Sequence, residues 1–221
     1  MRTLTLQGRH EKASSRKGRK RVEVILNTAR DILIDEGYAA LSMRRIAKMS
    51  GITVGNLSYY YTSKQDLVQD LLEAVIQGYM GWWDDIMADD SLTPEQQFAK
   101  IISFIIDDLT TKETTHFFPE LWALANHEPF AQEAMNTMYG HVRDMLMEMA
   151  QRINPALSVS EREILAVFMS SSFEGHTMFL GYGRRWSDRT PQISHIAIRS
   201  FLHLIKTATP ENINGFDPAI A

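Results

Sequence analysis

Residues 53–64 read T-V-G-N-L-S-Y-Y-Y-T-S-K and predict a short helix that begins at a capping residue. Thr53 can accept a hydrogen bond from a backbone N–H of the first turn through its side-chain oxygen. Leu57 and Tyr61 share the face expected to turn inward. The outward face carries small or hydrogen-bonding groups without a carboxylate, which can approach bases and phosphates in a major groove: Thr53, Val54, Gly55, Asn56, Ser58 and Tyr60.

A second short helix is expected directly upstream, where residues 42–50 read S-M-R-R-I-A-K-M-S. Ser42 is placed to cap this helix, and Gly51 permits the left-handed backbone that ends one. Ala47 is small enough for two helices to cross closely. Together the two helices and their turn predict a helix-turn-helix unit.

The order of residues in this region resembles that of a known family. Between residues 25 and 67 the chain reads I-L-x-x-A, then G-Y-x-x-L-S-M-R-R-I-A, then S-G-I-T-V-G-N-L-S-Y-Y-Y-T-S-K-x-x-L. This order is similar to the DNA-binding domain of the tetracycline-repressor (TetR) family of bacterial transcription regulators. That family usually has G-V-S-x-G-x-L-Y-Y-H-F-x-S-K, which Tyr59, Ser63 and Lys64 match directly. Ser58 stands for the first tyrosine of the pattern and keeps a hydroxyl group there.

The resemblance implies that the two helices bind a palindromic operator in double-stranded DNA. Phosphate contacts are expected from Arg44, Arg45, Thr53, Tyr59, Tyr60 and Lys64, and base contacts from Val54, Asn56 and Ser58, with Gly55 on the same outer side.

The net charge of −4 conceals an uneven distribution along the chain. Residues 1–64 contain 13 Lys and Arg against 5 Asp and Glu, which gives +8. Residues 65–221 contain 10 against 22, which gives −12. A polyanion is therefore expected to bind at the N-terminal end of the chain.

Composition argues against several other classes of protein. No apolar run approaches the ~20 residues that span a bilayer. The chain has no Cys, which excludes disulfides and thiolate metal sites. The N-terminus lacks the apolar core of a signal peptide, and Glu11 argues against a transit peptide. A cytoplasmic protein with no membrane partner is expected.

Four segments are expected along the chain. Residues 1–20 form a disordered basic arm, which either contacts phosphates or the minor groove beside the motif or is a solvated tail. Residues 21–66 form the helix-turn-helix DNA-binding domain. Residues 67–209 form a larger helical domain for effector binding and dimerisation, and residues 210–221 are a loose tail.

Helical periodicity predicts an all-α fold of about nine helices, three of them in the DNA-binding domain. A long helix that opens at Ser63 either transmits movement of the body to the recognition helix or merely connects the two. The polar stretch 110–116 is expected to be a loop before a short helix. Ser160 and Glu163 are expected to form the capping box of the helix that runs towards Leu180.

The last two long helices are joined by a short link and can pair with those of a second copy as a four-helix bundle. In the TetR family these helices form the dimer interface, so the resemblance implies a homodimer.

The middle of the body is rich in aromatic and methionine side chains, with polar groups among them that an apolar core would not choose. Such stripes are usually core, and a subset can line a cavity for a small-molecule effector of unknown identity. The residues expected to line it are Trp82, Phe118, Trp122, His127, Met138, Tyr139, Phe173 and His176. The run F-F-P-E-L-W-A-L-A is similar to what choline-responsive members of the TetR family carry there.

No pattern in the chain predicts an enzyme. His116, His141, Glu174 and His176 lie at no known metal-ligand spacing, and no Ser or Lys sits in a nucleophile motif. Catalytic residues, metals and cofactors are therefore not expected.

The expected function is that of a dimeric, sequence-specific DNA-binding transcription regulator, a repressor controlled by a small molecule. The alternative from another class is a helical dimeric adaptor whose basic end meets acidic proteins or anionic surfaces. An adaptor explains the charge distribution but not the order of residues around Gly51 and Tyr59.

Overall fold

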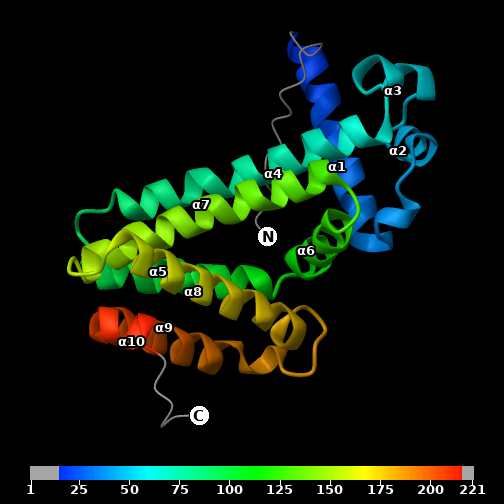
Figure 1. Ribbon diagram of the computed structural model, residues 1–221. Coiled ribbons are helices and arrows are strands. Elements are labelled where there is room, and N and C mark those ends of the chain that lie inside the picture. Colours follow the sequence, from blue (N-terminus) through cyan, green and yellow to red (C-terminus); the bar gives the residue numbers. More distant parts are fainter. Residues whose placement is uncertain (1–14, 216–221) are drawn as a thin grey trace. The chain divides into compact units, whose positions relative to one another are not determined.

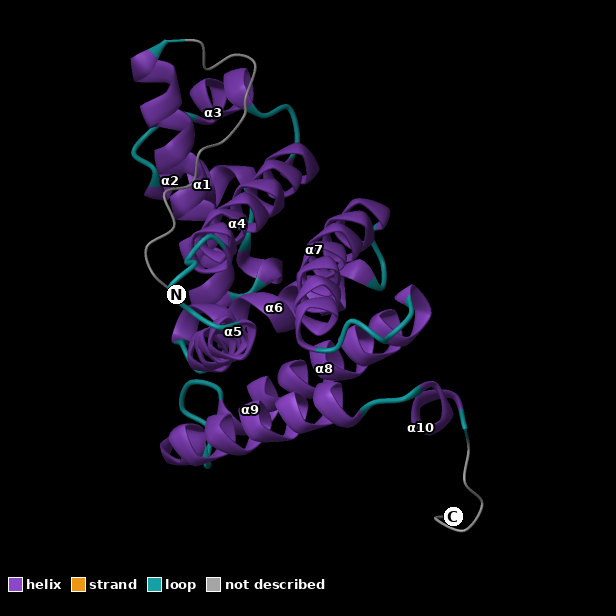
Figure 2. Cartoon of the chain, turned by 90° about the vertical axis from the view of Figure 1, so that its left-hand side faces the viewer, coloured by secondary structure: helices purple, strands orange, loops and turns teal. Residues whose placement is uncertain are grey.

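The computed structural model describes residues 15–215, apart from the side chains at positions 80–82 and 84. Within these residues the chain consists of helices joined by loops, without a strand (Figure 1, Figure 2). The helices are α1 (Arg16–Glu36), α2 (Met43–Met49), α3 (Val54–Tyr60), α4 (Lys64–Met87), α5 (Pro94–Leu109), α6 (Lys112–Ala125), α7 (Pro129–Ile153), α8 (Val159–Leu180), α9 (Thr190–Thr207) and α10 (Pro210–Asn214), with 3-10 turns at Tyr38–Ala40 and Ser187–Arg189. The expected all-α fold is confirmed: the nine expected helices are α1–α9, and α10 is additional.

Contacts divide the chain into two compact units. The first consists of Met1–Trp82 and Lys112–Met138, and the second of Trp83–Thr111 and Tyr139–Ala221. This grouping differs from the functional division expected at residue 66, which stays a prediction. Each unit has its own apolar core.

Helix α1 supplies much of the core of the first unit. Its residues Ile25, Leu26 and Ala29 are completely buried, and the helix packs against α2 and α6. The helix begins earlier than expected because the Ser15 side chain accepts the N–H of Gly18. Residues 16–20, expected in a disordered arm, are therefore helical, and residues 1–14 lie outside the described part of the chain.

Helix α6 also begins earlier than the sequence suggested. The expected loop over residues 110–116 is in fact confined to residues 110 and 111, because α6 starts at Lys112. Thr114 and Thr115 are buried in its first turns although they are polar. Pro119 lies inside the helix, where it has no N–H for the usual backbone hydrogen bond.

Helix α5 lies at the centre of the second unit, against α8 and α9. Four of its apolar side chains are completely buried at helical spacing: Phe98, Ile101, Ile102 and Ile106. Thr93 and Gln96 form a capping box at its start. Between the other two helices, the rings of Phe173 and Phe201 meet edge to face with centroids 5.6 Å apart.

Two helix starts in the second unit differ from expectation. Ser158, not Ser160, caps α8, and its capping partner is Glu161 rather than Glu163. Residues 210–214, expected in a loose tail, form the short helix α10, which Thr209 caps. Residues 216–221 lie outside the described part of the chain.

None of the helices described here combines the length and apolar character needed to cross a membrane.

Candidate nucleic-acid interface

The helix-turn-helix unit forms where it was expected, and local hydrogen bonds explain its boundaries. The Ser42 hydroxyl caps α2 by accepting the N–H of Arg45, and Thr53 caps α3 by accepting the N–H of Asn56. Between them Gly51 has φ +66°, a conformation that favours glycine. The Ile52 N–H donates to the Ala47 carbonyl at 3.0 Å, which ties the turn to the first helix.

Helix α3 is anchored on one side and open on the other. Leu57 is completely buried, and Tyr61, directly after the helix, is 1% exposed. The side chains of Val54 and Tyr59 are 44% and 57% exposed. The structure brings the predicted base-reading residues together on this open side, since Gly55, Asn56 and Ser58 are also exposed.

The two neighbouring tyrosines of α3 differ in exposure. Tyr60 is half-buried and meets the ring of Tyr59 edge to face, with centroids 5.1 Å apart. Tyr59 therefore has a supported ring and a solvent-facing surface, which suits contact with a sugar-phosphate backbone.

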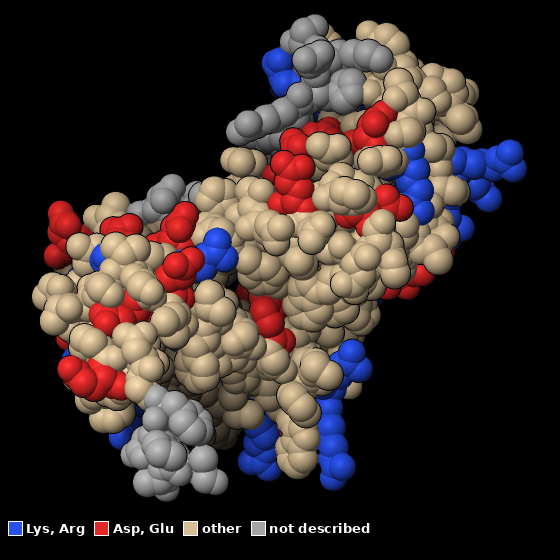
Figure 3. Space-filling view, in the orientation of Figure 1, with Lys and Arg blue, Asp and Glu red and all other residues tan. Residues whose placement is uncertain are grey.

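Arginines of α2 are exposed beside this surface, but they are not equivalent. Arg44 is exposed, whereas the guanidinium of Arg45 forms an ion pair with Glu36 at the end of α1. Lys48, one turn after Arg44, is exposed on the same short helix. Lys and Arg side chains project from the part of the first unit that carries α2, at the upper right in Figure 3.

The Lys64 side chain, expected to contact a phosphate, lies within the unit. Its ammonium group donates to the Tyr38 carbonyl at 3.1 Å and sits 3.5 Å from the centre of the Tyr38 ring. Burial lowers the pKa of Lys64, and the carboxylate of Glu128 acts in the opposite direction. Lys64 thus has a structural role through its contacts with Tyr38, and the expected contact with a DNA phosphate stays a prediction.

The start of α1 holds positive charge that the sequence assigned to a disordered arm. The first turns carry Arg16, Lys17, Arg19, Lys20 and Arg21, with no acidic residue in the first turn. Cations at a helix N-terminus oppose the helix dipole, so this placement does not favour the helix itself. It does concentrate positive potential on an ordered element of the first unit.

The recognition helix is linked to α4 through its last inward-facing side chain. The Tyr61 hydroxyl donates to the Asp70 carboxylate on α4. Burial and this hydrogen bond raise the pKa of Tyr61, so the phenol stays protonated and keeps donating.

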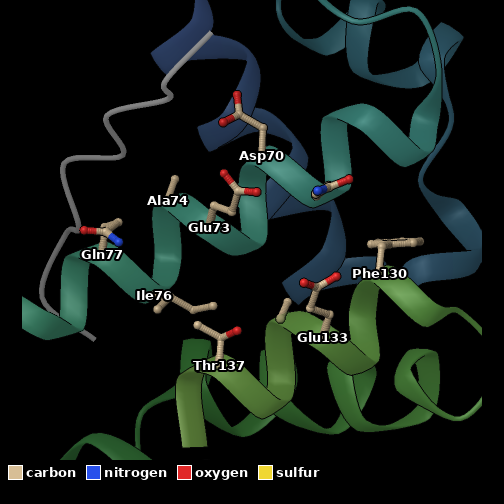
Figure 4. Close-up of a pocket in the computed structure, with 10 residues that line it drawn as sticks. Asp70, Glu73, Ala74, Ile76, Gln77, Phe130, Glu133 and Thr137 are labelled. Atoms are coloured by element: carbon tan, nitrogen blue, oxygen red, sulfur yellow. The ribbon is translucent and has the colours of Figure 1, made fainter. Parts of the chain in front are cut away.

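A cavity of about 300 Å³ lies between α4 and α7 in the first unit, with acidic side chains on both walls (Figure 4). Its lining consists of Gln69, Asp70, Glu73, Ala74, Ile76, Gln77, Phe130, Glu133, Ala134 and Thr137. Asp70, Glu73 and Glu133 give this surface a negative charge, which is unfavourable for contact with DNA.

The eight residues expected at an effector site are divided between the units. Phe118, Trp122, His127 and Met138 belong to the first unit, and Tyr139, Phe173 and His176 to the second. The Trp82 side chain lies outside the described part of the structure. The cavity between α4 and α7 is lined by none of them. These residues remain a prediction.

Comparison with known proteins finds a family match for the helix-turn-helix region. Residues 25–71 match the model of the bacterial regulatory proteins of the tetR family, a range that contains α2, α3 and the start of α4. The matched segment is similar to the DNA-binding domain of tetR-family regulators. The chain is a DNA-binding transcriptional regulator, and α2 and α3 form its helix-turn-helix.

Relatives that match beyond this segment are also transcriptional regulators by name. An uncharacterised HTH-type transcriptional regulator encoded in the dhlA 5′ region of Xanthobacter autotrophicus is 26% identical over 175 residues, which cover 76% of this chain and 83% of the relative. The HTH-type transcriptional regulator PksA of Bacillus subtilis is 26% identical over 113 residues, which cover 49% of this chain and 53% of PksA.

The fold is shared with solved structures of low sequence identity. A TetR-family regulator from Mesorhizobium loti is 16% identical, with a TM-score of 0.71 over 86% of this chain and 98% of that one. A transcriptional regulator from Rhodococcus sp. is also 16% identical, with a TM-score of 0.70 over 85% and 99% of the two chains.

Proposed function

We propose that this chain is a homodimeric repressor of the TetR family that binds an inverted-repeat operator and releases it when a small molecule binds in its C-terminal domain. The observation that carries the DNA-binding part is the exposed, carboxylate-free face of α3. The arginine Arg44 and the lysine Lys48 flank that face, and no acidic side chain lies on α2 or α3.

Dimerisation is supported by an apolar stripe on α8. Ile164, Val167 and Phe168 are all exposed at spacings of three and four residues, with Phe168 52% exposed. Further along the helix Met178 and Phe179 are exposed as well. Large apolar groups at helical spacing on a solvent-facing side are typical of a surface that another helix covers. We take a second copy of this chain as the partner, through α8 and α9.

Effector binding is supported by unpaired polar atoms in the second unit. Oε2 of Glu174 and Oγ1 of Thr177, both on α8, are buried without a hydrogen-bond partner among the described residues. Such atoms usually acquire a partner from water or a ligand. The proposed contact residues Phe118 and Met138 in the first unit and Phe173 in the second are themselves buried, so a ligand that touches any of them has to enter the core of that unit.

The DNA-binding part is tested by selecting bound sequences from random duplexes with the purified full chain, and then measuring affinity for the selected site. Tyr59→Ala should weaken that affinity by ~1–3 kcal/mol because a backbone contact is lost. Tyr182→Ala is a matched control, since Tyr182 is 56% exposed and lies after α8. No enriched sequence, or equal losses for the two variants, would contradict the proposal.

A further inference from the structure

The turn between α1 and α2 is held from two sides by side chains that are distant in sequence. Gly37 ends α1 with φ +80° and ψ 169°. The next residue, Tyr38, donates its N–H to Oε2 of Glu120 on α6 at 2.9 Å. Its carbonyl accepts a hydrogen bond from the Lys64 ammonium group at the start of α4. Both polar groups of the Tyr38 backbone are thus bonded to charged side chains.

Glu120 is the last of three residues on one stripe of α6 that engage the end of α1. Lys112 forms an ion pair with Asp35 at 2.6 Å, and Nδ1 of His116 lies 3.0 Å from the Ile34 carbonyl. Because a carbonyl only accepts, Nδ1 of His116 carries the proton and donates. Residues 112, 116 and 120 are four apart, so they share one face of the helix.

The contact with α6 supplies the cation and the hydrogen-bond donor that the C-terminal end of α1 lacks. The last turn of α1 carries no basic residue, and the final carbonyls of a helix have no partner within it. Lys112 brings a cation to this end, where the helix dipole favours one. His116 satisfies one of the terminal carbonyls.

The position of Glu120 leaves little freedom in the turn. A Cβ placed on Gly37 would lie 3.1 Å from Oε1 of Glu120, so the carboxylate fits directly against the glycine. The turn Gly37–Tyr38 sets the direction in which the chain leaves α1 for α2, and α2 carries the cap and turn that place α3. A change at this turn therefore changes the orientation of the recognition helix.

We infer that α6 helps to hold the helix-turn-helix (α2 and α3) in the orientation needed for operator binding, and that Glu120 is a positioning residue for this function. Glu120 touches no DNA in this account: its carboxylate fixes the Tyr38 backbone, and through it the relation of α1 to α2 and α3. The inference rests on the proposed operator binding.

The direction in which operator affinity changes when Glu120 is replaced distinguishes a positioning role from a purely electrostatic one. Removing a carboxylate from a DNA-binding protein lowers its negative charge, which by itself strengthens DNA binding. Loss of a positioning contact weakens binding to the selected operator instead. The test compares Glu120→Gln and Glu120→Ala with Glu133→Gln, which makes the same charge change on an exposed side chain of α7.

Affinity is measured for the selected operator and for a scrambled duplex at one salt concentration, and thermal unfolding shows whether each variant is folded. Glu120→Ala should bind the operator about tenfold more weakly, as expected for a lost hydrogen bond to a charged group. Glu120→Gln, which keeps an acceptor, should fall between Ala and the wild type. The ratio of operator to scrambled affinity should fall as well, whereas a partly unfolded sample would lose both affinities equally. Glu133→Gln should bind as the wild type or slightly more tightly.

Exchange of the Tyr38 amide proton, measured without DNA, gives a second readout. It should quicken by about tenfold in Glu120→Ala and stay unchanged in Glu133→Gln. Operator binding by Glu120→Ala that equals or exceeds the wild type, or an unchanged ratio, would overturn the inference. If the wild type prefers no sequence, the proposed operator binding fails, and unchanged Tyr38 exchange would then overturn the contact as well.

Discussion

The carboxyl group of Glu174 on α8 illustrates how burial shifts a single titration. Burial raises its pKa to about 7, while a hydrogen bond with Tyr139 acts in the opposite direction. The folded protein therefore favours the neutral acid, whereas the glutamate of the unfolded chain ionises near its ordinary pKa of 4.5. Ionisation consequently costs stability as pH rises from about 4.5, and the full cost is reached above pH 7.

Glu174→Gln removes this cost because an amide does not ionise. The variant should be more stable than the wild type at pH 8. The difference between their free energies of unfolding should be about 2 kcal/mol larger at pH 8 than at pH 5. Denaturant unfolding at the two pH values measures it. Glu148→Gln, at an exposed position of α7, should show no such difference between the two pH values. Equal shifts for both variants would mean that Glu174 titrates normally.

Two glycines should respond in opposite directions to the same substitution. Gly51→Ala should destabilise the protein by about 1 kcal/mol, since φ +66° disfavours a side chain although a Cβ there would have open space. Gly175→Ala, within α8 and also facing open space, should stabilise by about 0.5–1 kcal/mol through helix propensity. Thermal unfolding compares them. A stabilising Gly51→Ala would show that the turn does not need the left-handed conformation.

At the scale of helices, the Thr53 cap is the simplest feature to test. Thr53→Ala should cost about 1 kcal/mol because the N–H of Asn56 loses its acceptor, whereas Thr53→Ser should cost much less. Chemical denaturation gives both values. Equal stability of the Ala and Ser variants would show that solvent replaces the cap without loss.

Local signals predicted the helix-turn-helix because its caps and its glycine lie within a few residues of the helices they end. The same signals were ambiguous at α8, where Ser158 and Ser160 are each followed by a glutamate three residues later. They failed at α6, whose polar first turns are helical through burial against the rest of the first unit. Burial of this kind has no local pattern.

Contacts between residues distant in sequence within the first unit could not be predicted from the sequence. Glu120 and Tyr38 are 82 residues apart, and nothing near either residue indicates the other. For the same reason the contact of Lys64 with the Tyr38 ring was not predicted, and the phosphate contact expected of Lys64 stays a prediction. The exposed face of α3, by contrast, follows from helical periodicity around Leu57.

At the scale of the whole molecule, the proposed binding to an inverted repeat requires two copies of the chain. Phe168→Glu places a charge on the exposed apolar stripe of α8 and should convert the dimer into monomers, measured by sedimentation at micromolar concentration. Tyr59→Glu, on the exposed side of α3, is the control for an added charge at an exposed aromatic position outside the proposed interface. An unchanged dimer in Phe168→Glu would place the interface elsewhere.

The distribution of charge agrees with DNA binding by the N-terminal part of each copy, because the first 64 residues carry +8 and the remainder −12. Two such ends are needed to read both halves of an inverted repeat, whose half-sites lie ~34 Å apart on one side of the duplex.

The most direct test of the central claim is the stoichiometry and affinity of the full chain on its selected operator, compared with one isolated half-site at the same salt concentration. We expect two chains on the full site and at least about hundredfold weaker binding to the half-site, because one of the two helix-turn-helix units then loses its contacts. One chain per full site, or equal affinity for both duplexes, would contradict the claim.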